Sequence, residues 1–194
     1  MNEKIRIDWQ TSAGALVAFE PTPEELAQHS EALSGGYNDP ANAGLMGHTS
    51  LISPAEVVES YRDSIATGMR AFVLLLDGEF AGDGDLRNFR GDTAEFAFMI
   101  AAPSAQGKGL GTKFALMIHA FGFQRLELQR IYASVVPQNT ASRRVFEKLG
   151  YIEDNSPAGR EYAEEPGDVT LMLDRETFLR THTAALAQIQ IALR

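Results

Sequence analysis

The chain of 194 residues is 44% hydrophobic and 22% charged, which suits one globular domain with a buried core. Because it contains no cysteine, disulfides, thiolate metal sites and a cysteine acyl-enzyme are excluded. The formal net charge of −9 argues against a nucleic-acid partner and suits a cationic amine better, although an acidic solvated surface explains the charge equally well.

The N-terminus lacks the apolar segment of a secretory signal. No stretch reaches the run of about 20 apolar residues that a membrane-spanning helix needs. We therefore expect a cytoplasmic protein without a membrane partner.

The first part of the chain predicts one strand, two helices and a long loop. Residues 14–20 form a short apolar run of strand length. Each helix is expected to start at a capping box with proline at its first helical position, one from Thr22 to about Leu33 and one from Ser53 to about Gly68. Gly35 and Gly36 are expected to end the first helix, and residues 35–52, rich in Gly, Asn and Pro, to form a loop that covers a substrate.

Three strands joined by tight turns follow. Residues 71–76 are an apolar run, and Asp77-Gly78 is a hairpin turn signal that brings residues 79–87 back as a partner strand. A second turn at residues 88–92 leads into a strand over residues 93–100. This order predicts an antiparallel meander.

The second half alternates helices and strands, which makes the fold class α+β around one sheet. The expected elements are a helix over 109–123, a strand over 130–136, a helix over 140–149 ended by Gly150, a short strand at 151–152, a strand over 168–173 and an amphipathic helix over about 175–193. We expect residues 1–174 to form the domain. Residues 175–194 are expected to pack on it as a helix or to form an oligomer interface.

A glycine-rich segment stands between a predicted strand and a predicted helix. Residues 106–111 read Gln-Gly-Lys-Gly-Leu-Gly. Glycine lets the backbone approach a ligand closely, and the unpaired amides of a helix N-terminus bind phosphate oxygens, although a tight turn alone explains the same glycines. Gly109 follows Lys108 where a nucleotide P-loop has Ser or Thr, and the preceding meander does not suit a dinucleotide fold. A nucleotide-binding protein is therefore a poor alternative.

Two motifs together resemble the GNAT acetyltransferases. Gln106-x-x-Gly109-x-Gly111 resembles the pyrophosphate loop of that family. Asn139-x-x-Ser142, followed by Phe146-x-x-x-Gly150-Tyr151, resembles its downstream block. The resemblance implies a mostly antiparallel, twisted sheet of about six to seven strands flanked by helices, here with a C-terminal helical tail.

The opening of the chain resembles the branch of GNAT enzymes that acetylates ribosomal-protein N-termini. In that branch a glycine-led strand, a Thr/Ser-x-Glu-Asp/Glu helix start and an Asn-Asp-Pro turn follow one another. The matching residues here are Gly14, Thr22–Glu25 and Asn38–Pro40. This second match is less specific than the first.

The GNAT resemblance implies acetyl-CoA as co-substrate. The pyrophosphate is expected on the backbone amides of residues 106–111, and the pantetheine arm along the edge of the preceding strand, where a backbone amide can hold the thioester oxygen. The implied cofactor-binding residues are Met99, Ile100, Ala101, Gln106, Gly107, Lys108, Gly109, Leu110, Gly111, Thr112, Asn139, Ser142 and Phe146. Asn139 can instead serve only as a helix cap, and Lys108 as a solvated loop residue.

The implied catalytic residues are Glu95, Ser142 and Tyr151. An alkyl amine of pKa about 10 must lose a proton before attack, and Glu95 occupies the position of the family's general base. A solvated strand residue is the alternative, because Phe96 and Phe98 alternate with it. Phe146 replaces the tyrosine that usually protonates the leaving thiolate. That step falls to Ser142, Tyr151, water or no group, since a thiol of pKa about 8.5 leaves readily.

The function expected is direct acetyl transfer to a primary amine of a small molecule or of a peptide or protein N-terminus. Tyr37, Glu164 and Glu165 belong to loops that flank the acceptor side in this fold, and the glutamates suit a cationic substrate. The four histidines show no metal-ligand spacing, so no metal is expected. A rival function is a non-catalytic acyl-CoA-binding sensor or interaction module. A homodimer through the last helix is also open.

Overall fold

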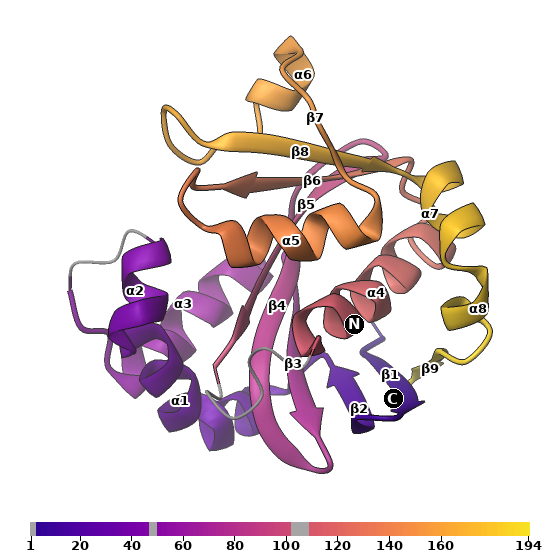
Figure 1. The fold of residues 1–194 in the computed structure, drawn as a ribbon. Helices are drawn as coiled ribbons and strands as arrows, with labels where there is room; N and C mark the ends of the chain where they lie inside the picture. Colours follow the sequence, from indigo (N-terminus) through magenta and orange to yellow (C-terminus); the bar gives the residue numbers. More distant parts are fainter. Residues whose placement is uncertain (1–2, 47–49, 102–108) are drawn as a thin grey trace.

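A computed structural model describes residues 3–46, 50–101 and 109–194 of the protein and contains one mixed sheet (Figure 1). Its strands are β1 Ile5–Thr11, β2 Gly14–Phe19, β3 Arg70–Leu76, β4 Glu79–Arg90, β5 Thr93–Ile100, β6 Arg130–Val135, β7 Ile152–Glu153, β8 Val169–Asp174 and β9 Gln190–Leu193. They hydrogen-bond in the order β7-β8-β6-β5-β4-β3-β2-β1-β9. Every neighbouring pair is antiparallel except β5 and β6, which run parallel.

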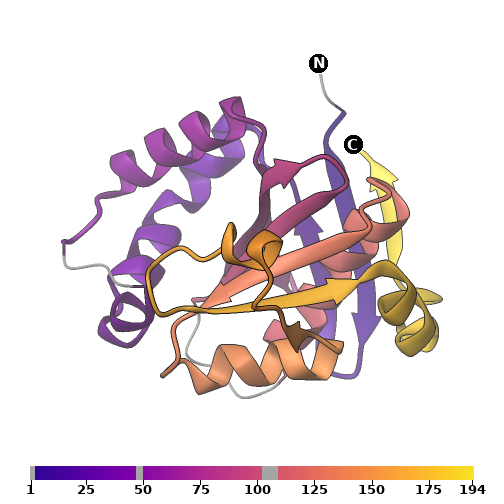
Figure 2. The ribbon, with the colours of Figure 1, turned by 90° about the horizontal axis from the view of Figure 1, so that it is seen from above.

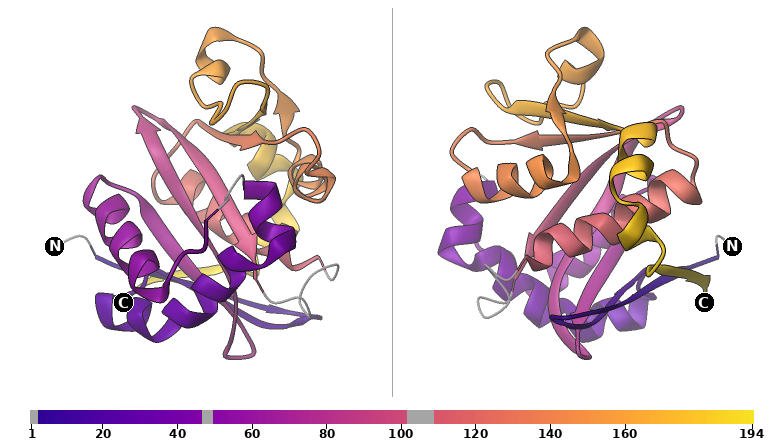
Figure 3. Two further views of the ribbon diagram at one scale, coloured as in Figure 1. Left: turned by 90° about the vertical axis from the view of Figure 1, so that its left-hand side faces the viewer. Right: turned by 45° about the vertical axis from the view of Figure 1, so that its right-hand side comes forward.

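Helices cover both faces of this sheet. Their bounds are α1 Pro23–Asn38, α2 Pro40–Met46, α3 Pro54–Ala66, α4 Leu110–Gln124, α5 Thr140–Leu149, α6 Pro157–Arg160, α7 Arg175–Thr181 and α8 Thr183–Leu186. One face carries α1, α2 and α3, and the other carries α4, α5 and α7 (Figures 1 and 3). Figure 2 shows the same separation from above. No helix in the described part of the chain is long and apolar enough to cross a membrane.

Two apolar clusters hold the layers together. The larger lies between the sheet and α4, where every residue from Phe114 to Phe123 is buried, and it includes Phe178 of α7. The smaller joins α1 and α3 through Leu26, Leu33 and Val57. Full burial of one Val, Leu or Phe side chain stabilises the fold by about 1.5–3 kcal/mol. The α4 side therefore contributes most of the hydrophobic stabilisation.

Both predicted capping boxes are confirmed, at Thr22 and Ser53, but the predicted end of the first helix is wrong. α1 continues through Gly35 and Gly36 to Asn38, and α2 replaces part of the expected loop. A Cβ added at Gly36 would lie 2.7 Å from the Cβ of Ala101. Gly36 therefore allows close contact between α1 and the end of β5, and it does not end the helix.

The predicted helix over residues 175–193 is also wrong beyond its first turns. α7 ends at Thr181, the short α8 follows, and β9 pairs antiparallel with β1. The strand β1 was not predicted from the sequence, and its open edge gives Gln190–Leu193 backbone partners that no local pattern indicates. The two additional strands bring the sheet to nine.

Candidate active site

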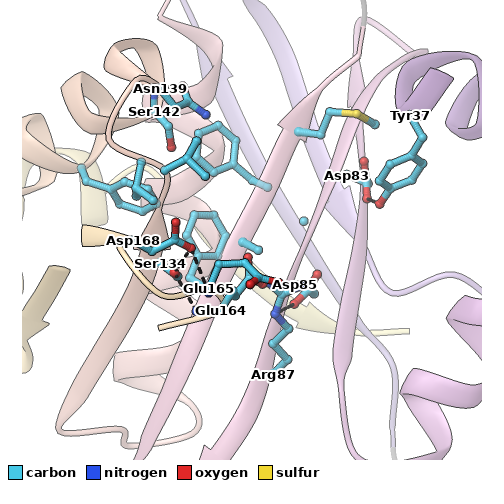
Figure 4. Close-up of a pocket in the computed structure, with 18 residues that line it drawn as sticks. Tyr37, Asp83, Asp85, Arg87, Ser134, Asn139, Ser142, Glu164, Glu165 and Asp168 are labelled. Carbon is cyan, nitrogen blue, oxygen red and sulfur yellow. Dashed lines mark hydrogen bonds and ion pairs between the residues drawn. The ribbon is translucent and has the colours of Figure 1, made fainter. Parts of the chain in front are cut away.

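The site begins where the two parallel strands separate. β5 and β6 pair only from Thr93↔Arg130 to Glu95↔Tyr132. Beyond Glu95, β5 stays with β4 while β6 stays with β8, so the sheet opens as a wedge (Figure 1). A cavity of about 390 Å³ occupies the opening. Its lining residues are Tyr37, Asp83, Gly84, Asp85, Arg87, Phe96, Ala97, Phe98, Met99, Ser134, Val135, Val136, Asn139, Ser142, Phe146, Glu164, Glu165 and Asp168 (Figure 4).

On one side of the opening, the first turn of α4 packs on β5 and α5. Gly109 caps α4 with φ 73°, and no side chain among the described residues accepts from the first amides of the helix, which suits these donors to a ligand. A Cβ at Gly111 would lie 3.0 Å from the ring of Phe98 and 3.4 Å from Val145. These amides and the helix dipole suit phosphate oxygens. Gln106, Gly107 and Lys108 lie outside the described residues.

The other predicted donor-side residues divide into two groups. Met99 and Phe146 line the cavity, as do Asn139 and Ser142 at the start of α5. The other described ones are absent from the lining: Gly109, Leu110, Gly111 and Thr112 form the start of α4, with Leu110 buried in the core. Ile100 pairs with Gly82, and the backbone amide of Ala101 donates to Ala81 at 3.0 Å, so both belong to the β4–β5 hairpin.

Asn139 combines its two predicted roles. Its Oδ1 accepts the backbone N–H of Ser142 at 3.0 Å and so caps α5. Both side chains lie on the same wall of the cavity (Figure 4). The cap therefore orients Ser142, whose predicted role as proton donor remains a prediction.

Phe146 lines the cavity one helical turn after Ser142 on α5. It is 2% exposed, and its ring lies 5.9 Å from that of Phe98, 6.2 Å from that of Phe96 and 4.9 Å from that of Tyr151. This aromatic cluster contributes apolar surface at the position where the family resemblance expects a tyrosine hydroxyl. No proton can come from this position.

The hydroxyl of Tyr151 is engaged inside the core. It donates to Nε2 of His119 at 2.5 Å, because Nδ1 of His119 must donate to the carbonyl of Ala115 at 2.6 Å. Burial lowers the pKa of His119 to about 3 and raises the pKa of Tyr151, so both stay neutral. Tyr151 is 6% exposed and is absent from the cavity lining. Its position does not support the predicted role as an acid.

Glu95 is buried, with both carboxylate oxygens occupied. Arg87 donates to Oε1 at 3.2 Å and Asn88 to Oε2 at 2.6 Å, and Glu95 is only 1% exposed. It is therefore not the solvated strand residue of the alternative interpretation. It is also absent from the cavity lining, so its role as the base stays a prediction without direct access to an acceptor.

The far side of the cavity is acidic. Its carboxylates come from β4 and from the segment before β8, and Arg87 is the only cationic side chain among the described lining residues. The acidic lining residues are Asp83, Asp85, Glu164, Glu165 and Asp168. Glu164 and Glu165 were expected here from the sequence, whereas the two aspartates of β4 were not. The available signal was the alternation of Asp83, Asp85 and Arg87 within a strand that follows a buried one.

The two aspartates sit in different surroundings. Asp83 is 2% exposed, and its Oδ2 accepts hydrogen bonds from Tyr37 at 2.8 Å and from Tyr61. Burial raises its pKa to about 6, against the lowering effect of these hydroxyls. Burial raises the pKa of Asp85 to about 7, with Arg87 opposing the shift and nearby carboxylates adding to it. Oδ1 of each aspartate is buried without a hydrogen-bond partner among the described residues.

The segment before β8 is fastened across the opening. Arg87 pairs with Glu164, and the hydroxyl of Ser134 donates to Asp168 at 2.9 Å. Tyr162 stacks on Tyr132 with ring centroids 4.3 Å apart. These contacts fix the acidic wall relative to the sheet. Within the described residues, no group of three or more histidine or acidic side chains is placed to hold a metal ion.

The profile of the family described as "Acetyltransferase (GNAT) domain" matches residues 17–152. The chain belongs to the GNAT acetyltransferase family. Both motifs that suggested this family, Gln106–Gly111 and Asn139–Tyr151, lie inside the matched region, so that resemblance is confirmed.

Curated relatives of this GNAT chain are N-acetyltransferases. An N-acetyltransferase 9-like protein of Nematostella vectensis is 32% identical over 100 residues, which cover 49% of this chain and 48% of that protein. Spermidine N(1)-acetyltransferase of Escherichia coli K12 is 38% identical over 84 residues, covering 42% and 45%. The chain thus spans about half the length of the curated relatives it matches.

Solved structures share the fold over nearly the whole chain. RimJ of Mycobacterium smegmatis, in complex with CoA-disulfide, superposes with a TM-score of 0.74 at 21% identity over 96% of each chain. The aminoglycoside acetyltransferase AAC(6')-Ib, in complex with coenzyme A, gives 0.71 at 22% identity over 86% of this chain and 99% of that one. The predicted GNAT fold is therefore confirmed.

Proposed function

We propose that this GNAT domain transfers the acetyl group of acetyl-CoA directly to a primary amine of a cationic acceptor. One observation carries the proposal: a single cavity crosses the opening between β5 and β6 and connects Phe98, against which the first turn of α4 packs, with the carboxylates of β4. Such a cavity lets a thioester enter from one side and a cationic amine from the other. The absence of cysteine favours direct attack over a covalent relay.

The described residues fit a CoA thioester. The uncapped amides at the start of α4 suit the pyrophosphate, and beyond Glu95 one edge of β5 has no partner in β6 and suits the amide-containing pantetheine arm. Bound acetyl-CoA supplies an activated acetyl group. Asn139, Ser142 and Phe146 form the wall next to it.

The acidic wall favours acceptors that carry positive charge. Relatives are named for spermidine and for aminoglycosides, which are cationic amines. A peptide or protein N-terminus remains an alternative acceptor, because a cationic peptide meets the same electrostatic requirement. A panel of spermidine, an aminoglycoside and cationic N-terminal peptides, with release of free thiol as the readout, separates these acceptors.

Calorimetric titration of acetyl-CoA into the protein tests the donor site first. Gly109→Trp should abolish binding, since a large side chain at φ 73° disturbs the backbone that presents the amides. Gly78→Trp is the matched control, because Gly78 has φ 87° in the β3–β4 turn and no atom near its Cβ position. Equal loss of binding in both variants contradicts the placement of the donor.

A second function, an acyl-CoA-binding module without catalysis, is favoured by Phe146, which cannot donate a proton. Tight acetyl-CoA binding without thiol release from any amine supports it, and turnover rejects it. A cytoplasmic location and a homodimer through residues 175–194 also remain predictions. Cell fractionation and sedimentation check them.

A further inference from the structure

Three acidic side chains share one face of the β4–β5 hairpin. Asp83 and Asp85 alternate along β4, and Glu95 on β5 lies opposite Arg87, the next residue on that face. Only the two aspartates reach the cavity, Asp83 beside Tyr37 and Asp85 beside Arg87 (Figure 4). Glu95 instead accepts a hydrogen bond from the guanidinium of Arg87. Among the acidic residues of this hairpin, those that can meet an acceptor amine therefore lie on β4.

The hydrogen bonds of the two aspartates separate their roles. Oδ2 of Asp83 accepts two tyrosine hydroxyls, which favour its charged form and hold it in place. Asp85 accepts no hydrogen bond from the described residues, and Nε of Arg87 lies 3.8 Å from its Oδ1. Arg87 also pairs with Glu95 and Glu164, so its charge is shared. Asp85 is therefore the carboxylate with fewer hydrogen bonds, and its side chain is 15% exposed.

We propose that Asp85, and not Glu95, is the catalytic residue that takes the proton from the ammonium group of the acceptor, while Asp83 orients that group. The inference rests on the proposed acetyl transfer. It identifies a base one strand away from the position that the family resemblance indicates.

The ammonium group gives one proton to the Asp85 carboxylate, and the freed amine attacks the thioester carbon. The C–N bond forms, the C–S bond breaks, and the electron pair of the C–S bond leaves on the CoA sulfur. The second proton lost by the nitrogen ends on this thiolate through a solvent molecule or Ser142. Asp85 then returns its proton to solvent, so one ammonium ion and one thioester give one amide, one thiol and one proton.

The charges around Asp85 suit this task. Asp83 and Arg87 flank it on β4, Glu95 faces it from β5, Glu164 from the segment before β8 and Tyr37 from α1. Burial among them raises its pKa from 3.8 to about 7. Against an alkyl ammonium of pKa about 10, that rise makes proton transfer about a thousandfold more favourable than for an ordinary aspartate. Turnover should rise with pH through about 7 as Asp85 ionises.

The test compares Asp85→Asn with Glu95→Gln in the full chain, using the best acceptor of the panel. We expect Asp85→Asn to lower kcat by about 10²–10⁴ and to remove the rise of kcat with pH, with acetyl-CoA binding unchanged. Glu95→Gln should keep that rise. Asp92→Asn, an exposed carboxylate-to-amide change in the β4–β5 turn, is the matched control and should behave as wild type. Carboxyl ¹³C NMR of wild type and Asp85→Asn reads the titration of Asp85 directly.

Loss of the pH-dependent rise in Asp85→Asn alone supports the assignment. Its retention in Asp85→Asn, its loss in Glu95→Gln, or an Asp85 carboxyl that titrates at the ordinary aspartate value overturns it. If wild type releases no thiol with any amine while it binds acetyl-CoA, the proposed transferase function itself fails and this role fails with it.

Discussion

The two sides of the cavity consist of different kinds of chemical groups. The donor side uses backbone amides and small or apolar residues, represented by Gly109, Gly111 and Phe98. The acceptor side uses buried carboxylates held by tyrosine and arginine side chains, with Asp83 and Asp85 at its centre. Backbone amides bind phosphate without ionising, whereas buried carboxylates carry charge that costs folding free energy. The acceptor side is therefore the part of the site that lowers the stability of the fold.

The largest expected effect is a gain in stability when one of these buried carboxylates is replaced. Asp85→Asn should raise the free energy of unfolding at pH 8 by up to about 4 kcal/mol, the equivalent of a pKa rise from 3.8 to about 7. A folded-state pKa above the unfolded one means that wild type gains stability as the pH falls from about 7 to 4. In urea unfolding between pH 4 and 8, the difference in the free energy of unfolding between the variant and wild type should become smaller as the pH falls. A pH-independent difference contradicts the assignment of the cost to this carboxylate.

Gly111→Leu should break the donor side alone. The new side chain meets the ring of Phe98 and Val145, within 3.0 and 3.4 Å of its Cβ, and overpacking of this kind costs about 1–3 kcal/mol. Acetyl-CoA affinity should fall about 10- to 100-fold by calorimetry. Gly35→Leu is the control, because no atom lies within 4 Å of its Cβ position. Unchanged affinity in Gly111→Leu removes the start of α4 from the donor site.

Tyr151→Phe tests whether Tyr151 belongs to the active site or only to the buried core. It leaves Nε2 of His119 without its donor in a fully buried position, which costs about 1–3 kcal/mol of stability. Turnover should change little, because Tyr151 does not face the cavity. Thermal unfolding and steady-state kinetics measure the two effects separately. A large fall in kcat restores Tyr151 as the acid.

Glu165→Gln should give the smallest effect, confined to the acceptor side. Glu165 is exposed at the cavity edge, where a charge pair contributes about 0.2–1 kcal/mol. The KM for spermidine should rise at most about fivefold, with acetyl-CoA binding unaltered. Added salt should reduce the difference between variant and wild type. An equal effect at high salt argues against an electrostatic role.

The donor side could be predicted from sequence because its residues are consecutive. Gly109 and Gly111 stand at the start of α4, and Asn139 precedes its helix by one residue, so local spacing reports the geometry. Capping boxes and the Asp77-Gly78 turn are local in the same way. Both turn residues have positive φ, 51° and 87°, as the hairpin requires.

The acceptor side and the chain's last strand could not be predicted, since both depend on distant partners. Asp83 becomes a site residue only because α1 and α3 bring Tyr37 and Tyr61 over it. Gly36 resembles a helix end in sequence, yet it serves contact with Met99 and Ala101, some 60 residues away. β9 exists because β1 offers an edge. Tertiary pairing overrides local propensity at each of these places.

The separation of β5 from β6 has a consequence for how occupancy of the cavity can be observed. The backbone amide of Ala101 donates to β4, so the alternating amide of Phe98 points away from β4 toward the opening. A pantetheine arm lying there acts as a substitute strand that completes the interrupted ladder. Acetyl-CoA should therefore slow hydrogen exchange at the amide of Phe98, which reports donor binding without any acceptor or turnover.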